Sequence, residues 1–434
     1  MHSTPTLETA AAAMPRAVRY REVRRATERL AAPLSPEDCQ VQSMDDASPT
    51  KWHLAHTSWF FETFVLERAL RGYRVFHPEF RVLFNSYYQT VGEQHPRPLR
   101  GLLTRPTLDE VCAYRRHVDE HMLALLEHRG GDPLADVIEL GLHHEQQHQE
   151  LILTDIKHLF SRHPLRPAYR ECPVAPRVEA AALRWHRYAE GLRWIGHEGP
   201  GFAFDNECPR HRVFVDAFEI AGRLVTNGEF LGFIEDRGYT RPDLWLSDAW
   251  HTLQARGWRA PLYWEPRDGA WQVLTLSGLR ELRADEPVCH VSYYEADAFA
   301  RWAGARLPTE AEWEVTAVET RIDGHTVAGN SVASNFVELG LLHPAPAAAG
   351  VPLLAQLFGD VWEWTQSPYT PYPRYRPPAG ALGEYNGKFM CNQMVLRGGS
   401  CVTPASHMRA TYRNFFPPDA RWQFSGIRLA RDLR

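Results

Sequence analysis

The sequence of 434 residues contains no long apolar run, no low-complexity tract and no internal repeat. No segment approaches the roughly 18 consecutive apolar residues that a membrane-spanning helix needs. The short alanine run at 10–13 is not the long apolar core of a signal peptide. We therefore expect no membrane partner and no secretion.

Cysteine is scarce and scattered. The seven cysteines never form a Cys-x-x-Cys pair, and their number is odd. This pattern argues against a disulfide framework and against a cysteine-based zinc site, and it favours a reducing, cytoplasmic compartment. The net charge of −5 also excludes a general preference for nucleic acid or anionic membranes.

The residues that are present favour a well-packed protein of two or three domains, because 44% are apolar and 14 are Trp. Helical patterns dominate residues 1–165. They predict helices over 16–31, 50–70 and 108–128, followed by a fourth around 140–157. Four helices with one long connection are typical of a helical bundle. A Pro- and Arg-rich stretch at 166–180 is the expected linker.

Residues 181–434 have a different composition. Gly, Pro and Trp are dense, and short strand-like runs such as 212–220 are separated by turns. Only two helices are predicted here, over 227–236 and 293–303. The expected fold class is therefore multidomain, with a four-helix bundle followed by an α+β domain rich in irregular structure.

The most informative stretch is His144-Glu-Gln-Gln-His148, inside the fourth expected helix. Residues four apart lie on one face of a helix, so both histidines can reach one metal ion, and Gln147 lies on the same side. The pattern is also the signature of zinc proteases. That interpretation fails at the third ligand, because Leu151 and Thr154 stand where the extended signature needs Gly and His.

A third ligand is available upstream. His53 and His56 lie three apart in the expected helix 50–70, and the packing of two bundle helices can bring one of them to the metal. Spacing alone does not choose between them. Three neutral imidazoles leave coordination positions open for substrate and oxygen. They resemble the ligand set of non-haem Fe(II) oxygenases, with a third imidazole in place of the carboxylate.

Long segments of the chain resemble two known domains. The first half resembles the DinB-like bundle domain, and the second half resembles the formylglycine-generating-enzyme domain, which is related to C-type lectins. The segments that carry the second resemblance are 225–230, 287–292, 303–314, 359–365 and 397–400. Two such domains in this order are similar to the ergothioneine sulfoxide synthases (EgtB), and the resemblance covers nearly the whole chain.

This resemblance implies an enzyme that uses Fe(II) and O₂ to join a cysteine-type thiol to C2 of the imidazole of hercynine, giving a sulfoxide. The family segment (D/H)-L-A-H contributes its second histidine to the metal. The implied ligands are His56, His144 and His148. Gln147 is implied to contact the hercynine imidazole, and Asn414 and Phe415 its betaine. An aromatic face at Phe415 suits a quaternary ammonium, which cannot donate hydrogen bonds.

Two positions depart from the branch of the family that uses γ-glutamylcysteine. An Asp that binds the γ-glutamyl part is Phe416 here, and the catalytic Tyr three residues before Tyr385 is Leu382. A second branch carries Asn-Ser-Tyr-Tyr in the long loop of the bundle, and this chain has it at 85–88. We therefore predict Tyr88, and after it Tyr87, as the phenol that delivers a proton or hydrogen atom. We also predict cysteine as the preferred thiol.

Arg97 and Arg100 match two arginines that hold the carboxylate of the thiol in the family, and guanidinium groups suit carboxylates.

The copper-binding cysteines of formylglycine-generating enzymes are replaced by Thr403 and Met408, which excludes copper-dependent formylglycine formation. Two alternatives are a non-catalytic lectin-like binding module and an ovothiol-type synthase acting on histidine. The latter usually carries a further C-terminal methyltransferase, whereas this sequence ends at Arg434.

Overall fold

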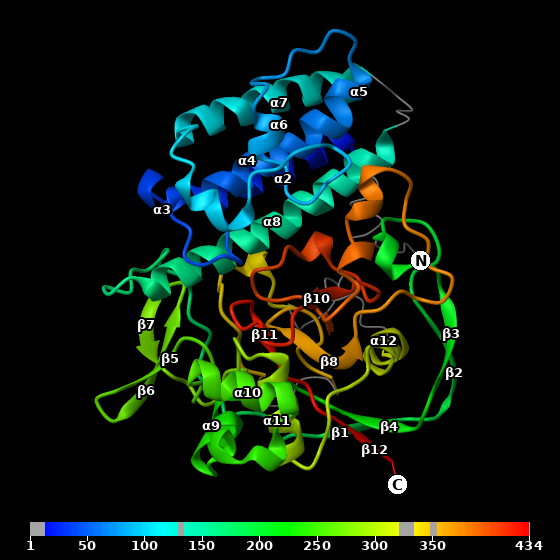
Figure 1. The fold of residues 1–434 in the computed structure, drawn as a ribbon. Coiled ribbons are helices and arrows are strands. Elements are labelled where there is room, and N and C mark those ends of the chain that lie inside the picture. The colour runs from blue at the N-terminus through cyan, green and yellow to red at the C-terminus, as the bar shows by residue number, and fades with distance from the viewer. Residues whose placement is uncertain (1–13, 129–133, 321–333, 348–353, 434) are drawn as a thin grey trace, which may run out of the picture. The chain divides into compact units, whose positions relative to one another are not determined.

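Two compact units make up the part of the chain that the computed structural model describes, namely residues 14–128, 134–320, 334–347 and 354–433. The helical unit contains the described residues up to 170 together with 377–387. The α/β unit contains the described residues of 171–376 and 388–433. The elements of each unit are labelled in Figure 1.

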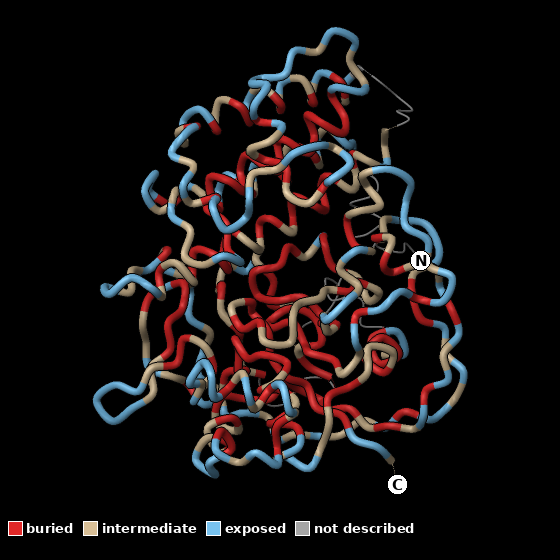
Figure 2. Tube along the Cα trace, viewed as in Figure 1, coloured by how far each residue is buried: buried red, intermediate tan, exposed pale blue. Residues whose placement is uncertain are grey.

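Four long helices form the helical unit and confirm the predicted bundle (Figure 1). They are α2 (Arg16–Ala31), α4 (Thr50–Phe61), α7 (Leu108–His128) and α8 (Ala135–Arg162). α4 continues through a π-helical turn, Glu62–Leu66, into α5 (Glu67–Ala69), so the helix predicted over 50–70 is present but irregular. Every residue of α4 is buried (Figure 2), although its sequence also contains polar residues such as Lys51 and Ser58.

Short elements fill the connections of the helical unit. They are α3 (Pro36–Gln40), α6 (Phe80–Leu83) and a 3₁₀ helix at Arg97–Leu102. α3 begins at a capping box in which Ser35 and Asp38 satisfy each other's backbone N–H. No helix in the described ranges is long and apolar enough to cross a membrane.

Small sheets organise the described part of the α/β unit. One has the order β1–β4–β12, a second β10–β9–β8–β11, a third pairs β2 with β3, and a fourth has the order β5–β6–β7. All pairings are antiparallel except that of β11 with β8. The strands are β1 (Trp185–Tyr188), β2 (Gly191–Ile195), β3 (His211–Val215), β4 (Phe218–Ala221), β5 (Trp264–Arg267), β6 (Ala270–Thr275), β7 (Gly278–Glu281), β8 (Trp362–Pro368), β9 (Met394–Arg397), β10 (Asn414–Phe416), β11 (Ser425–Gly426) and β12 (Ala430–Asp432).

Helices of this unit are more numerous than the sequence predicted. The two expected helices are present as α9 (Asn227–Glu235) and α11 (Tyr293–Trp302), but α10 (Ser247–Arg256) and α12 (Glu310–Glu319) were missed. α10 buries only Ala249 and Leu253, so its apolar stripe is too narrow to stand out. α12 buries six consecutive residues, 312–317, so it has no helical periodicity.

Buried ion pairs hold the core of the α/β unit. Glu363 accepts from Nε and Nη2 of the fully buried Arg428 and from the Trp313 indole N–H, with its oxygens 2.7–2.8 Å from these donors. Arg397 donates to Glu314 at 3.0 Å. Each carboxylate has a guanidinium partner, which offsets the cost of burying its charge.

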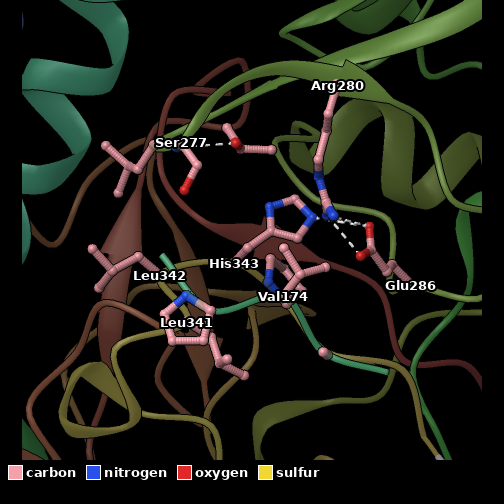
Figure 3. Close-up of a pocket in the computed structure, with 12 residues that line it drawn as sticks. Val174, Ser277, Arg280, Glu286, Leu341, Leu342 and His343 are labelled. Atoms are coloured by element: carbon pink, nitrogen blue, oxygen red, sulfur yellow. Dashed lines mark hydrogen bonds and ion pairs between the residues drawn. The ribbon is translucent and has the colours of Figure 1, made fainter. Parts of the chain in front are cut away.

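A small pocket in the α/β unit is lined partly by such paired charges (Figure 3). Arg280 donates to both oxygens of Glu286, at 2.6 and 2.7 Å, and His343 Nε2 lies 3.1 Å from the same carboxylate. The charges of the pocket therefore neutralise one another, and they do not point to an ionic ligand.

Candidate metal centre

Three histidines from two helices converge in the helical unit. His56 lies on α4, and His144 and His148 lie one turn apart on α8. Nε2 of His144 lies 3.1 Å from Nε2 of His56 and 3.1 Å from Nε2 of His148. Within the described residues this trio has its ligand atoms all within 4.8 Å of one another, which is close enough to share one metal ion.

The three rings are kept neutral by burial. Burial lowers the pKa of His144 to about 3 and holds the pKa of His56 and His148 well below the usual range, with neighbouring histidines adding to the effect for His56 and His148. A neutral imidazole has the free nitrogen lone pair that a metal ligand needs. Nδ1 of His56 lies 2.6 Å from the Phe84 carbonyl, so this ring carries its proton there and presents Nε2 to the site.

Aromatic rings pack against the three histidines. His56 is stacked between Trp52 and Trp59, with ring centroids 4.5 and 5.5 Å away. The ring of Phe60 lies 4.9 Å from that of His144. These contacts fix the ring orientations and explain the aromatic residues of α4.

Glu145, the acidic residue of the His-Glu-x-x-His pattern, is not available as a general base. Its carboxylate accepts from Arg24 at 2.9 Å, Arg115 at 3.0 Å and the Thr27 hydroxyl at 2.7 Å. Burial alone would raise the pKa of Glu145, but Arg24 and Arg115 outweigh it and hold the pKa at about 2. This arrangement gives an independent reason to reject the zinc-protease interpretation.

The Tyr-Tyr loop is held by the side chain of Asn85. Its amide nitrogen donates to the carbonyls of Tyr88, Gly92 and Glu93 at 3.1–3.2 Å, and its oxygen accepts from the Tyr88 backbone. Tyr88 is fully buried against Trp59, with ring centroids 5.6 Å apart, and burial raises the pKa of its phenol well above the usual range. The Tyr88 hydroxyl is therefore a proton donor and not a phenolate at physiological pH.

The segment 377–387 brings a further tyrosine to the histidines. The ring of Tyr385 lies 5.7 Å from that of His144 and 6.2 Å from that of Tyr87, and its hydroxyl donates to the Gln147 side chain. The carboxylate of Glu384 accepts from the backbone N–H groups of Gln89 and Thr90, both at 2.9 Å, and from the Thr90 hydroxyl. Glu384 thus fastens the segment to the loop that follows the tyrosines.

Arg100 is a buried cation without an ion pair among the described residues. It lies over the Trp52 ring at 3.4 Å and donates to the Ser48 hydroxyl at 2.9 Å, and its Nε has no hydrogen-bond partner in the ranges that the structure describes. Burial lowers the pKa of Arg100 to about 9, so it remains charged at neutral pH. Arg97 is exposed and lies 4.0 Å from Asp46. Of the two arginines, Arg100 has the environment of an anion-binding group.

The remaining predicted residues, Asn414, Phe415 and Phe416, form β10 of the α/β unit. Phe415 stacks on Tyr369, with ring centroids 4.0 Å apart, and lies 5.9 Å from the Phe389 ring. The aromatic face predicted at Phe415 therefore belongs to a cluster of three rings.

Comparisons with known proteins agree with this architecture. The sulfatase-modifying factor enzyme 1-like domain matches residues 189–336 and 346–433, and the DinB superfamily matches residues 19–152. The chain is 33% identical over 408 residues to the hercynine oxygenase of Mycobacterium tuberculosis, which covers 91% of this chain and 93% of that protein. This chain belongs to the ergothioneine sulfoxide synthase (EgtB) family.

Other relatives of this EgtB family member match either most of the chain or only part of it. The hercynine oxygenase of Mycolicibacterium thermoresistibile is 32% identical over 422 residues, 92% of this chain and 91% of its own length. The formylglycine-generating enzyme of Mus musculus is 30% identical over 278 residues, 56% of this chain and 73% of its own. Family membership makes the chain an oxygenase-type enzyme of ergothioneine biosynthesis, which acts on small molecules with O₂ and a metal.

Two features of this EgtB centre were not predicted from the sequence. His53 and Asp155 pair with each other next to the cluster, and Glu384 fastens the tyrosine loop. Asp155 follows His148 by seven residues and therefore lies on the same face of α8, which is a signal that the sequence did contain. Glu384 has no comparable signal, because its partners are almost 300 residues away in the chain.

Proposed function

We propose that the chain is a hercynylcysteine S-oxide synthase that uses Fe(II) and O₂. The observation that carries the proposal is the buried cluster of three neutral histidines in a chain of this family. In the proposed reaction a C–S bond replaces the C2–H bond of hercynine and the S–H bond of cysteine. One oxygen atom of O₂ goes to sulfur and the other leaves as water.

Three imidazole nitrogens fit Fe(II), because they leave open positions for substrates. The metal, when bound, supplies the redox chemistry with O₂. His56, His144 and His148 would hold it through Nε2, and Trp52, Trp59 and Phe60 keep those rings in place. The pairing of Glu145 with Arg24 and Arg115 keeps a carboxylate out of the ligand set.

Hercynine is proposed as the substrate that receives sulfur, because the named relatives are hercynine oxygenases. Gln147 would orient its imidazole, and Tyr385 holds the Gln147 side chain in place. The family resemblance assigns the betaine to Asn414 and Phe415. A quaternary ammonium binds to aromatic faces without hydrogen bonds, which suits the ring of Phe415.

Cysteine is proposed as the thiol. The guanidinium of Arg100, which has no ion pair in the described part of the chain, suits its carboxylate, with Arg97 as an outer contact. Phe416 replaces the acidic residue that would pair with the γ-glutamyl ammonium, and placing an ammonium beside Phe costs about 1–3 kcal/mol. This cost corresponds to roughly a tenfold to a hundredfold preference for cysteine.

The test is turnover of the aerobic Fe(II)-loaded enzyme with hercynine and either cysteine or γ-glutamylcysteine, followed by mass spectrometry. We expect hercynylcysteine sulfoxide and a larger kcat/KM for cysteine. The variant Phe416→Asp should narrow the gap between the two thiols. A preference of the wild type for γ-glutamylcysteine would contradict the argument from Phe416.

Two other outcomes identify the alternatives. Sulfur transfer to C5 of histidine would indicate an ovothiol-type enzyme. Binding of hercynine without O₂ uptake would indicate a non-catalytic binding module.

The phenol of Tyr88, or failing that Tyr87, is proposed as the proton or hydrogen-atom donor that directs the reaction to C–S bond formation.

A further inference from the structure

The spare histidine of α4, His53, uses both ring nitrogens inside the protein. Its Nδ1 lies 2.8 Å from Nδ1 of His148, and its Nε2 lies 3.1 Å from Oδ2 of Asp155. His148 uses its other nitrogen, Nε2, in the three-histidine cluster. His53 therefore touches the back of a candidate ligand, and both of its nitrogens are engaged away from the metal position.

Asp155 extends this contact toward the anion-binding arginine. The same Oδ2 accepts from the backbone N–H of Ser48 at 2.8 Å, just before α4 begins. The hydroxyl of Ser48 accepts from Arg100 at 2.9 Å. All of these groups are buried, so water does not compete for the bonds. A continuous chain of hydrogen bonds therefore joins Arg100, through Ser48, Asp155 and His53, to His148.

Only one arrangement of protons satisfies every bond once Nε2 of His148 faces a metal. His148 must then carry its proton on Nδ1 and donate it to Nδ1 of His53. His53 carries its own proton on Nε2 and donates it to Asp155. A carboxylate behind a ligand histidine fixes its tautomer and ring orientation and makes its nitrogen a stronger donor to the metal. In this protein the imidazole of His53 lies between the carboxylate of Asp155 and the ligand His148.

We propose that His53 and Asp155 are positioning residues that set His148 as a metal ligand and, through Ser48, hold Arg100 for the carboxylate of the thiol. The proposal rests on the proposed function for the identity of the metal and of the thiol. It assigns to one network two tasks that are separate in the family resemblance, namely holding the metal and binding the second substrate.

The proposed effect of His53 and Asp155 on metal binding is tested by titrating the metal-free protein with Co(II) against a competing chelator. We expect His53→Ala and Asp155→Asn to weaken Co(II) binding by about tenfold to a hundredfold. His53→Asn places a polar atom near the position of Nδ1 and should restore part of the loss. The matched control is His121→Ala, which removes a half-buried histidine bonded to the His117 carbonyl on α7 and should leave Co(II) affinity unchanged.

A second readout isolates the hydrogen bond. In the Co(II) protein, the ring N–H of His148 gives an exchangeable, paramagnetically shifted proton NMR signal. His53→Ala should remove that signal or speed its exchange with solvent, whereas His121→Ala should not change it. Unchanged Co(II) affinity together with an unchanged signal in His53→Ala would overturn the proposal.

The substrate arm is tested by Ser48→Ala, which keeps the backbone bond to Asp155 and removes only the hydroxyl contact to Arg100. We expect unchanged Co(II) affinity and a severalfold higher KM for cysteine at unchanged kcat. Asp155→Asn should change both quantities. An unchanged KM in both variants would refute the link to Arg100. Failure of the wild type to bind Co(II) or Fe(II) would instead refute the proposed function itself.

Discussion

Two faces of α8 bury polar side chains in opposite ways. On one face Glu145 is fully buried and receives hydrogen bonds from Arg24, Arg115 and Thr27. On the other face His144 and His148 direct their Nε2 atoms at His56 and at each other, and Nδ1 of His144 has no hydrogen-bond partner among the described residues. Neighbouring residues of one helix are thus satisfied by the protein on one side and left for a ligand on the other.

The same contrast separates two buried arginines of the helical unit. Arg115 donates to Glu145, Thr57 and a backbone carbonyl, all at 2.9–3.0 Å. Arg100 has a hydroxyl and an indole face but no ion pair among the described residues. A buried charge with an ion-pair partner stabilises a particular packing, whereas one without such a partner is costly unless a ligand supplies the missing charge. The difference therefore separates structural groups from functional ones.

The largest expected effect is on metal binding. His56→Ala should abolish near-stoichiometric Fe(II) binding, because it removes a ligand, whereas His53→Ala should still bind most of the iron at saturating metal. The measurement is the amount of bound iron in an anaerobic equilibrium titration carried to excess Fe(II). If His53→Ala lost the iron and His56→Ala kept it, the assignment of the ligand would be wrong.

A substitution of Glu145, on the other face of α8, should lower the stability of the protein and leave metal binding unchanged. Glu145→Gln leaves Arg24 and Arg115 without their shared carboxylate and should lower the free energy of unfolding by about 3–5 kcal/mol. Urea denaturation measures the loss, and iron content per folded protein should be unchanged. The control is Glu127→Gln, which breaks an exposed contact of 3.5 Å with Arg21 and should cost less than about 1 kcal/mol.

The contribution of Glu145 to the stability of the protein should depend on pH in a definite direction. The pKa of Glu145 is about 2 in the folded protein, compared with an ordinary value near 4.5. Its contribution to stability should therefore be complete above pH 4.5 and lost as the pH falls toward 2. The wild type should lose more stability than Glu145→Gln over this window.

A smaller, chemical effect is expected at Tyr88. Tyr88→Phe keeps the ring packing against Trp59 and removes only the buried hydroxyl. Iron and hercynine binding should be retained, while the product shifts from sulfoxide toward thiol oxidation without C–S coupling. Mass spectrometry of both products gives the ratio. Wild-type ratios in Tyr88→Phe, Tyr87→Phe and the double variant would exclude such a role for the loop.

The smallest expected effect is on affinity for the thiol. Arg100→Gln should raise the KM for cysteine by about tenfold to a hundredfold, because a charge-assisted hydrogen bond is lost, without loss of stability. Arg97→Gln is the control and should change KM less, because Arg97 is about half exposed. If Arg100→Gln lowered the stability of the protein and left the KM for cysteine unchanged, Arg100 would have a structural role, as Arg115 does.

Much of this could be read from the sequence. The four long helices followed from apolar periodicity and end signals, and the spacing of His144 and His148 predicted a shared ligand face. α12 was missed because it is buried on all sides, and the bond of His53 to Asp155 was missed although both residues lie on predicted helices. Periodicity gives the face of a helix, but it does not give the partner that the face meets.

The contacts of Glu384 and Tyr385 could not have been predicted by local patterns. Their partners on the tyrosine loop and on α8 lie more than 200 residues earlier. Segments this far apart meet only because of the tertiary fold, and a single sequence carries no spacing rule for such a meeting.

The membership of residues 377–387 in the helical unit has a consequence for protein synthesis. The ribosome adds about 5–20 residues per second, so Tyr385 is added ~11–45 s after the end of α8. During that interval the nascent chain already contains all three histidines but lacks Tyr385 and Glu384. We expect a polypeptide released at residue 170 to have the three proposed metal ligands without the tyrosine that holds the Gln147 side chain, and therefore to leave that side chain without this contact.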